Sequence, residues 1–132
     1  MHVHLIGVSG TAMGSLAGLL KRAGHRVTGS DTAFYPPMGD ALLRWGIETM
    51  QGFDPEHLNP APDLVVVGNV CRSSNVEARA AIERGLPYTS LPKALAQFCL
   101  EGRRSFVVAG THGKTTTTAL CAHVLDQVGL AP

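Results

Sequence analysis

The sequence predicts an α/β protein: a doubly wound, mainly parallel, Rossmann-like sheet, followed by the first strand, phosphate loop and helix of a second domain. Short apolar segments alternate with segments whose apolar residues recur at helical spacing. One segment, Leu64-Val65-Val66-Val67, is an unbroken apolar run of mostly β-branched residues, as in strands covered on both faces. Glycine-rich turns follow two of the predicted strands, which is where such folds bind phosphates.

The first half of the sheet domain has two clear strand and helix units. A strand at residues 2–6 precedes a helix whose apolar positions recur up to Leu20 and which ends at Gly24. A second strand at 26–30 ends at Asp31, and Pro36-Pro37 interrupts the chain before a helix over 38–45.

The second half continues the same alternation. Strands are predicted at 47–50 and 63–67, and Ser74 and Glu77 have the spacing of a capping box that opens a helix to residue 84. A short strand at 86–89 and a helix from 92 to about 100 complete this domain, which we place at residues 1–100.

A polar linker, residues 101–104, separates this domain from the rest of the chain. Beyond it, 105–109 are predicted as a strand, 110–115 as a loop and 116–128 as a helix that ends at Gly129. Residues 105–132 are therefore expected to be the start of a second domain, truncated at Pro132.

The composition argues against several classes of protein. Eleven Lys and Arg stand against ten Asp and Glu, so nothing favours nucleic acid or an anionic membrane as a partner. Three cysteines without close spacing favour neither a disulfide framework nor a zinc site. The apolar run at 3–8 is too short for a signal peptide or a membrane span. We expect a soluble, cytoplasmic protein.

The sharpest motif is a glycine-rich loop between the predicted strand at 105–109 and the helix after it. Backbone N–H groups and the helix dipole can surround a polyphosphate there. Lys114 would reach the β- and γ-phosphates as the catalytic cation, and the Thr115 hydroxyl would bind Mg²⁺. The usual loop has a glycine where Val108 stands, so this loop is short. The predicted ATP-binding residues are Gly110, Thr111, His112, Gly113, Lys114, Thr115 and Thr116.

The first turn also joins a strand to a helix, at the place where a doubly wound fold binds a diphosphate. Ser9 and Ala12 occupy two glycine positions of the dinucleotide fingerprint, so spacing alone gives weak support for NAD. Glycines needed only for tight packing are the alternative reading. The predicted diphosphate-binding residues are Gly7, Ser9, Gly10, Thr11, Ala12, Met13 and Gly14.

Polar residues follow two further predicted strands. Asp31 lies about twenty residues after the glycine turn, where a carboxylate commonly accepts hydrogen bonds from a ribose or base, and Ser30 could assist it. Asp31 could instead only start a turn. Asn69 follows the strand at 63–67. Its amide either faces the ligand or belongs to a simple turn. His2 and His4 alternate on one strand and are expected to line the sheet rather than bind zinc.

Together these motifs resemble the Mur ligases, ATP-dependent amide-forming enzymes of cell-wall metabolism. The run from Ala109 to Thr117 is similar to the short ATP loop of that family, which accounts for Val108. Gly7, Gly10, Met13 and Gly14 resemble its first turn, and Gly29-Ser30-Asp31 the end of its second strand. The segments Tyr35-Pro36-Pro37-Met38, Gln51-Gly52-Phe53-Asp54-Pro55 and Gly68-Asn69 resemble the branch that adds a murein tripeptide more than the branch that adds L-alanine.

The resemblance implies a function in peptidoglycan recycling. UDP-N-acetylmuramate would bind to the first domain, with its diphosphate on the first turn and its uridine near Ser30, Asp31 and Asn69. Its carboxylate would take the γ-phosphate of ATP, with Mg²⁺, and the amine substrate would displace phosphate. The amine site and the remaining metal ligands would lie in domains beyond Pro132, so the chain alone is expected to be inactive.

Two other functions stay open at this point. A nicotinamide-dependent oxidoreductase would use the first turn and Asp31 in the same way, but would leave the loop at 110–116 without a purpose. A stand-alone nucleotide-sugar-binding module would need no further domain.

Overall fold

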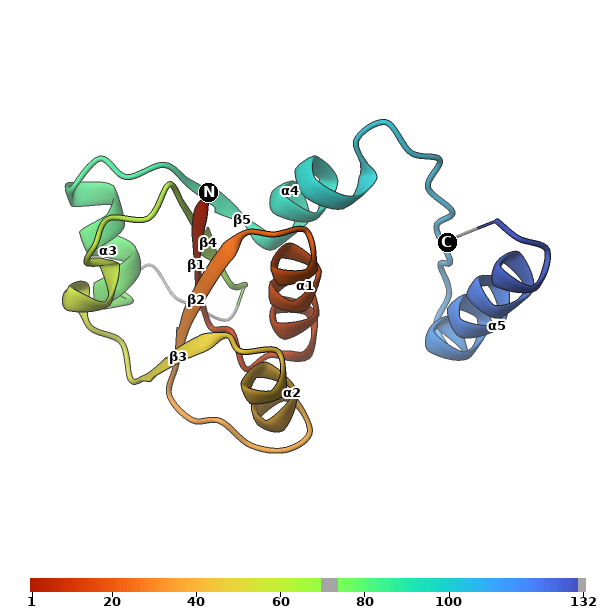
Figure 1. Cartoon of the computed structure of the whole chain (residues 1–132), viewed down its shortest axis with the longest axis horizontal. Coiled ribbons are helices and arrows are strands. Elements are labelled where there is room, and N and C mark those ends of the chain that lie inside the picture. Colours follow the sequence, from red (N-terminus) through yellow and green to blue (C-terminus); the bar gives the residue numbers. More distant parts are fainter. Residues whose placement is uncertain (70–73, 131–132) are drawn as a thin grey trace. The chain divides into compact units, whose positions relative to one another are not determined.

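The structure is a computed structural model and describes residues 1–69 and 74–130. The chain divides into two compact units, Met1–Glu101 and Gly102–Pro132. The first unit contains a sheet with helices on both faces, and the second contains one helix and the segment before it (Figure 1).

The sheet of the first unit has five strands in the order β3-β2-β1-β4-β5, and every neighbouring pair is parallel. Strands added on both sides of β1 are the mark of a doubly wound sheet, so the predicted fold class is confirmed. The carboxyl ends of parallel strands share one edge of the sheet, where ligands of such folds bind. The strands are β1 (His2–Ile6), β2 (Arg26–Asp31), β3 (Glu48–Gln51), β4 (Leu64–Val67) and β5 (Tyr88–Ser90).

Each face of the sheet has its own apolar core, because successive side chains of a strand point to opposite faces. Leu5 packs with Leu16 of α1 on one face, whereas the next residue, Ile6, packs with Leu58 on the other. Each such fully buried side chain contributes about 1.5–3 kcal/mol to folding. The helices of this unit are α1 (Thr11–Arg22), α2 (Met38–Arg44), the 3-10 helix η1 (Pro55–Leu58), α3 (Val76–Glu83), α4 (Leu91–Leu95) and the π-helix η2 (Ala96–Leu100).

Helix α3 begins differently from the sequence prediction. Its N-cap is Asn75, whose side-chain oxygen accepts from the N–H groups of Glu77 and Ala78. The predicted capping box from Ser74 to Glu77 is therefore wrong by one residue. The Glu77 side chain does not return to the helix start, because it is fully buried beneath the sheet.

The boundaries near β5 also differ from the prediction. Leu86 was expected to open the strand, but its N–H donates to the carbonyl of Ala81 and closes the end of α3. The strand therefore begins at Tyr88 and ends at Ser90. The predicted helix from 92 to 100 consists of α4 followed by η2.

Helices α1 and α2 approach each other closely through two glycines. A Cβ atom on Gly14 would lie 2.2 Å from the sulfur of Met38, and one on Gly18 would lie 2.8 Å from the Trp45 ring. Real Cβ atoms do not come this close to other heavy atoms. Gly14, predicted as a phosphate-turn residue, therefore has a packing role.

The second unit lacks the predicted strand at 105–109. A strand needs a neighbour for its backbone N–H and C=O groups, and the described residues of this unit contain no other strand. Phe106 and Val107 are exposed, at 77% and 86%. Its helix, α5 (Lys114–Gln127), begins two residues before the predicted start.

The histidine at the start of β1 predicts a pH effect on stability. Burial first, then Arg26 and His4, lower the pKa of His2 below the ordinary value of 6.5. The folded chain thus binds fewer protons than the unfolded chain just below that pH, so stability present above pH 6.5 is lost as the pH falls through the lowered pKa. We expect His2→Gln to reduce the loss of Tm between pH 7 and pH 5 by about 1–3 °C, a small effect because solvent screens this partly exposed ring.

Thermal unfolding of both proteins at each pH measures this difference. Equal losses of Tm in the wild type and His2→Gln would contradict it.

Candidate functional site

The first glycine turn follows β1 at the carboxyl edge of the sheet. Gly7 adopts a φ of 86°, a conformation that other residues rarely accept. Its N–H and that of Val8 both donate to the carbonyl of Ser30 in β2, at 2.8 and 3.1 Å. The turn is therefore fixed to the neighbouring strand by its backbone.

Helix α1 begins directly after this turn and points its amino end outward. Gly10 is the N-cap and offers no side-chain cap, and the first helical bond joins the N–H of Gly14 to the carbonyl of Gly10. The N–H groups of the preceding helical residues have no partner within the helix, which suits an anion. Gly10, Thr11 and Ala12 are exposed, whereas Gly7, Met13 and Gly14 are buried. No Lys or Arg occurs from residue 7 to 14.

Asp31 holds the turn from the end of β2. Its Oδ2 accepts from the N–H of Ser9 at 2.9 Å and from the Ser9 hydroxyl at 2.5 Å. Its Oδ1 accepts from the N–H of Thr32 at 2.7 Å. Hydrogen bonds to a carboxylate are stronger than neutral ones. Asp31 thus orients the Ser9 segment of the turn.

Ser30 has a different place from the one its position in the sequence implied. Its side chain is fully buried, and its hydroxyl donates to Oε2 of Glu77 at 2.7 Å. Only its backbone carbonyl is directed to the glycine turn. A direct hydrogen bond from the Ser30 hydroxyl to a ligand would require this buried bond to break.

A buried polar network that sequence reasoning missed lies on the α3 face of the sheet. Oε1 of Glu77 is 2.5 Å from Nε2 of His4, and both side chains are fully buried. Nδ1 of His4 is 2.7 Å from the Thr28 hydroxyl, which also contacts His2 at 3.0 Å. The expectation that His2 and His4 line the sheet agrees with these contacts.

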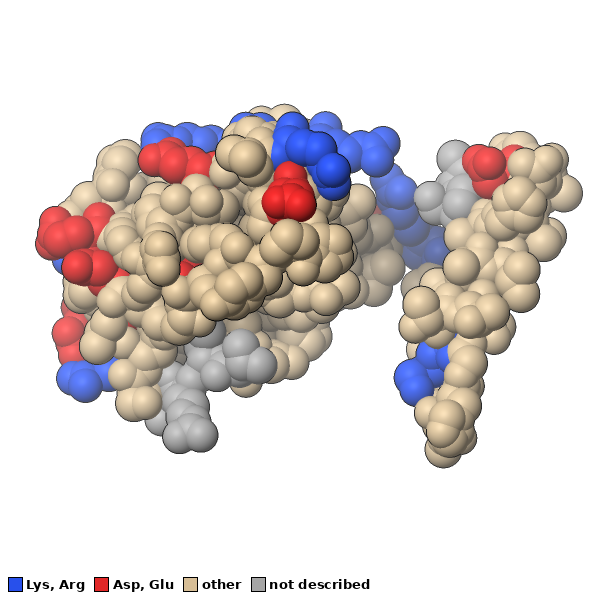
Figure 2. All heavy atoms as spheres, turned by 90° about the horizontal axis from the view of Figure 1, so that it is seen from below, with Lys and Arg blue, Asp and Glu red and all other residues tan. Residues whose placement is uncertain are grey.

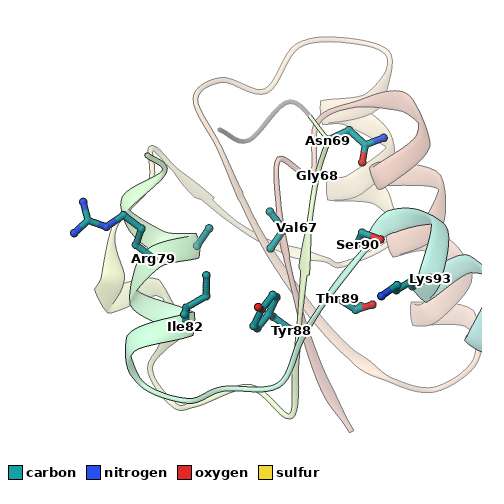
Figure 3. Close-up of a pocket in the computed structure, with 10 residues that line it drawn as sticks. Val67, Gly68, Asn69, Arg79, Ile82, Tyr88, Thr89, Ser90 and Lys93 are labelled. Carbon is teal, nitrogen blue, oxygen red and sulfur yellow. The ribbon is translucent and has the colours of Figure 1, made fainter. Parts of the chain in front are cut away.

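The end of β4 lies beside the end of β1. The N–H of Gly68 donates to the carbonyl of Ile6 at 2.9 Å, and Asn69 is exposed. A shallow pocket of about 460 Å³ opens here between α3 and β5, and its lining includes Gly68 and Asn69 (Figure 3). Neither the glycine turn nor Asp31 lines this pocket. Of the predicted site residues, only Asn69 therefore lines this pocket.

The second predicted site is the loop before α5. Gly113 is the N-cap of the helix and has a φ of 75°, so Lys114, Thr115 and Thr116 form the first helical turn. Nζ of Lys114 donates to the carbonyls of Gly110 and Thr111, at 2.8 and 3.4 Å. The lysine thus reaches back across the loop, and the open helix start together with this cation fits a polyphosphate.

The other predicted loop residues are accessible. Thr111 and His112 contact each other through Oγ1 and Nδ1 at 3.2 Å, and the segment from 110 to 118 is exposed. Thr115, the predicted Mg²⁺ ligand, lies in the first turn of α5 and is exposed.

Two general features are absent from residues 1–69 and 74–130. No group of three or more His, Cys, Asp or Glu side chains in these ranges could hold a metal, and no helix there is long and apolar enough to cross a membrane. Cys99 and Cys121 are free, while Cys71 lies outside the described residues. Charged side chains are scattered around a large uncharged area on the visible face of the first unit (Figure 2).

Comparisons of the sequence with known proteins agree on one family. The family model described as Mur ligase family, catalytic domain, matches residues 2–103. UDP-N-acetylmuramate--L-alanyl-gamma-D-glutamyl-meso-2,6-diaminoheptandioate ligase of Escherichia coli (strain K12) is 46% identical over 100% of this chain and 29% of its own length. UDP-N-acetylmuramate--L-alanine ligase of Kineococcus radiotolerans is 43% identical over 98% of this chain and 28% of its own length.

The structural comparison gives the same result. The crystal structure of a murein peptide ligase from Psychrobacter arcticus 273-4 has a TM-score of 0.93 and 47% identity, and the match covers 98% of this chain and 27% of that one. The chain thus spans less than a third of the length of these relatives. The oxidoreductase alternative has no support among these matches. Because the family model covers more than half of the chain, and sequence and structure agree, the chain belongs to the Mur ligase family.

Proposed function

We propose that this chain forms the amino-terminal part of an ATP-dependent ligase that joins UDP-N-acetylmuramate to a murein peptide, L-alanyl-γ-D-glutamyl-meso-diaminopimelate. The observation that carries the proposal is the first glycine turn, which β2 fixes through the Ser30 carbonyl and the Asp31 carboxylate and which leads into the open start of α1. Relatives that match the whole chain are named for these two substrates.

The donor site follows from the chemistry of the first turn. The exposed start of α1 offers N–H groups to the diphosphate, and the helix dipole stabilises negative charge there. Asp31 and Asn69, at the ends of β2 and β4, lie at the same edge of the sheet and are proposed to contact the uridine and ribose. The site uses backbone groups for the diphosphate, because residues 7–14 contain no basic side chain.

The ATP site is proposed at the loop of the second unit. ATP with Mg²⁺ supplies the phosphoryl group that activates the donor carboxylate. Lys114 would exchange its bonds to loop carbonyls for bonds to the β- and γ-phosphates. The Thr115 hydroxyl would hold the metal from the first turn of α5. The short loop with Gly113 as N-cap allows the backbone to approach the phosphates closely.

The proposed reaction has two steps. A carboxylate oxygen of the donor bonds to the γ-phosphorus as the bond to ADP breaks, which gives an acyl phosphate. The amine nitrogen then bonds to the acyl carbon, and phosphate leaves with the electron pair of the C–O bond while the amine loses a proton. Lys114 offsets charge on the moving phosphoryl group.

Binding and turnover are expected to separate in the isolated 132-residue chain. We expect it to bind UDP-N-acetylmuramate, because all of the proposed donor contacts, from Gly7 to Asn69, lie in the first unit. We expect no sustained amide formation or ATP hydrolysis, because phosphoryl transfer depends on a fully held metal and positioned groups. The matched part is only 29% of the Escherichia coli relative, so most of that enzyme lies outside it.

The purified chain is titrated with UDP-N-acetylmuramate by calorimetry. It is then mixed with the donor, Mg-ATP and either the tripeptide or L-alanine, while phosphate release and product mass are followed. Sustained turnover that disappears in Lys114→Ala would show that the chain suffices by itself. In a complete ligase that carries this chain, product formed with L-alanine but not with the tripeptide would identify the L-alanine branch instead.

A further inference from the structure

The buried carboxylate of Glu77 connects the far face of the sheet to the first glycine turn. Glu77 comes from α3, and its side chain is fully buried. One oxygen is 2.5 Å from Nε2 of His4 and the other accepts from the Ser30 hydroxyl at 2.7 Å. The proposed ligand lies at the carboxyl edge of the sheet and not on this face.

Ser30 forms the link between the two sites. While its hydroxyl donates to Glu77, its carbonyl accepts from the N–H groups of Gly7 and Val8 at 2.8 and 3.1 Å. One residue therefore connects the buried carboxylate with the backbone of the turn. The Ser30 side chain is held on one face of β2, which limits rotation of the peptide group that carries this carbonyl.

The other side of the network is firmly held as well. Nδ1 of His4 contacts the Thr28 hydroxyl at 2.7 Å, so the imidazole has partners at both nitrogens. Nδ1 of His57 lies 3.7 Å from Oε2 of Glu77, too far for a hydrogen bond, and it has no hydrogen-bond partner among the described residues. The hydrogen bonds to Glu77 thus come from His4 and Ser30.

A buried carboxylate is a costly way to fill a core, since apolar side chains of similar volume do so without desolvating a charge. Its directional bonds do more than fill space, because they select one arrangement of the groups around them. The group selected here is the residue that holds the glycine turn.

We propose that Glu77 is a positioning residue for the diphosphate turn and acts through Ser30. This inference rests on the proposed function, which places a UDP-sugar at that turn. Glu77 itself does not contact the ligand. It keeps the Ser30 carbonyl in place, so that Gly7 and Val8 hold the turn in the shape that exposes the start of α1.

The first test needs no ligand. Amide exchange of the 132-residue chain is measured by NMR at Gly7 and Val8, relative to Val65 and Val66 of β4. We expect exchange at the two turn amides to be about tenfold faster in Ser30→Ala, because a lost hydrogen bond contributes about 1.4 kcal/mol. Unchanged relative exchange at Gly7 and Val8 in a folded Ser30→Ala chain would overturn the proposal.

Two further variants separate positioning from general stability. Glu77→Gln keeps an acceptor for Ser30 and a partner for His4, so we expect exchange within about threefold of wild type, whereas Glu77→Ala should resemble Ser30→Ala. Thr28→Val is the matched control, because it removes a hydroxyl from the same network but leaves the Ser30 branch intact. Equal effects of Thr28→Val and Ser30→Ala on the turn amides would overturn the proposal.

The second test measures the dissociation constant for UDP-N-acetylmuramate by calorimetry. We expect binding about tenfold weaker in Ser30→Ala and unchanged in Thr28→Val, at a temperature well below Tm for each protein. A wild-type chain that fails to bind would overturn the proposed donor site, while the exchange experiment still decides whether Glu77 positions the turn. Normal wild-type binding with an unchanged dissociation constant in Ser30→Ala would overturn the positioning role.

Discussion

Replacement of Lys114 by alanine is expected to lower kcat of a complete ligase that carries this chain by about 100- to 1000-fold. The lysine lies at the open start of α5, and its ammonium group reaches across the preceding loop to the carbonyl of Gly110 at 2.8 Å. In the proposed ATP site, a cation in this place would offset charge that develops on the transferred phosphoryl group, and alanine would leave that charge without a partner. Steady-state phosphate release at saturating substrates measures the loss.

Lys21→Ala is the matched control for this experiment. Lys21 is partly exposed, and its Nζ also donates to a backbone carbonyl, that of Gly46 at 2.9 Å, but it lies on α1 outside both proposed sites. We expect kcat within about twofold of wild type, as for most surface substitutions. A Lys114→Ala enzyme as active as Lys21→Ala would remove Lys114 from catalysis.

Asp31→Ala is expected to weaken binding of UDP-N-acetylmuramate by about ten- to a hundredfold, since a hydrogen bond to a charged group contributes roughly 1.5 to 3 kcal/mol. The sequence supplied one reason, its place at the end of β2. The structure supplies a second, because the carboxylate holds both the N–H and the hydroxyl of Ser9. Calorimetric titration of the 132-residue chain measures the change.

Two further variants show whether a loss of affinity comes from Asp31 itself or from the turn that it holds. Asp63→Ala is the control, because Asp63 also accepts from a backbone N–H, that of His2 at 2.6 Å, but at the amino end of β1. We expect it to bind the donor normally. Ser9→Ala keeps the carboxylate and removes one of its partners, so a loss as large as in Asp31→Ala would assign the effect to the turn. Unchanged affinity in Asp31→Ala would remove Asp31 from the site.

Most of the sheet could be predicted from the sequence because its signals are local. Apolar strands separated by glycine and proline give β1, β2 and β4 almost to the residue. The errors arose where distant groups decide the structure. Residues 105–109 are apolar enough for a strand, but a strand also requires a paired neighbour, and periodicity does not reveal whether one is present.

The candidate site could be predicted by position along the chain but not by side-chain direction. The glycine turn, Asp31 and Asn69 do follow the strands that end at one edge of the sheet. The buried partner of the Ser30 hydroxyl is Glu77, 47 residues later, and the spacing of the first two strands does not reveal it. A signal for this was present: Glu77 lies on the same helix stripe as the buried Ala80 and Ala81, where a carboxylate needs a partner.

The close contact between α1 and α2 also has an evolutionary consequence. A side chain at Gly14 would occupy the volume of the Met38 thioether. A larger residue at position 14 therefore requires the Met38 side chain to move or residue 38 to be shorter. The residues that fit at position 14 thus depend on the side chain at position 38, although the two positions lie far apart in the chain. A glycine retained at position 14 would thus reflect the packing of a neighbouring helix as much as the chemistry of a bound nucleotide.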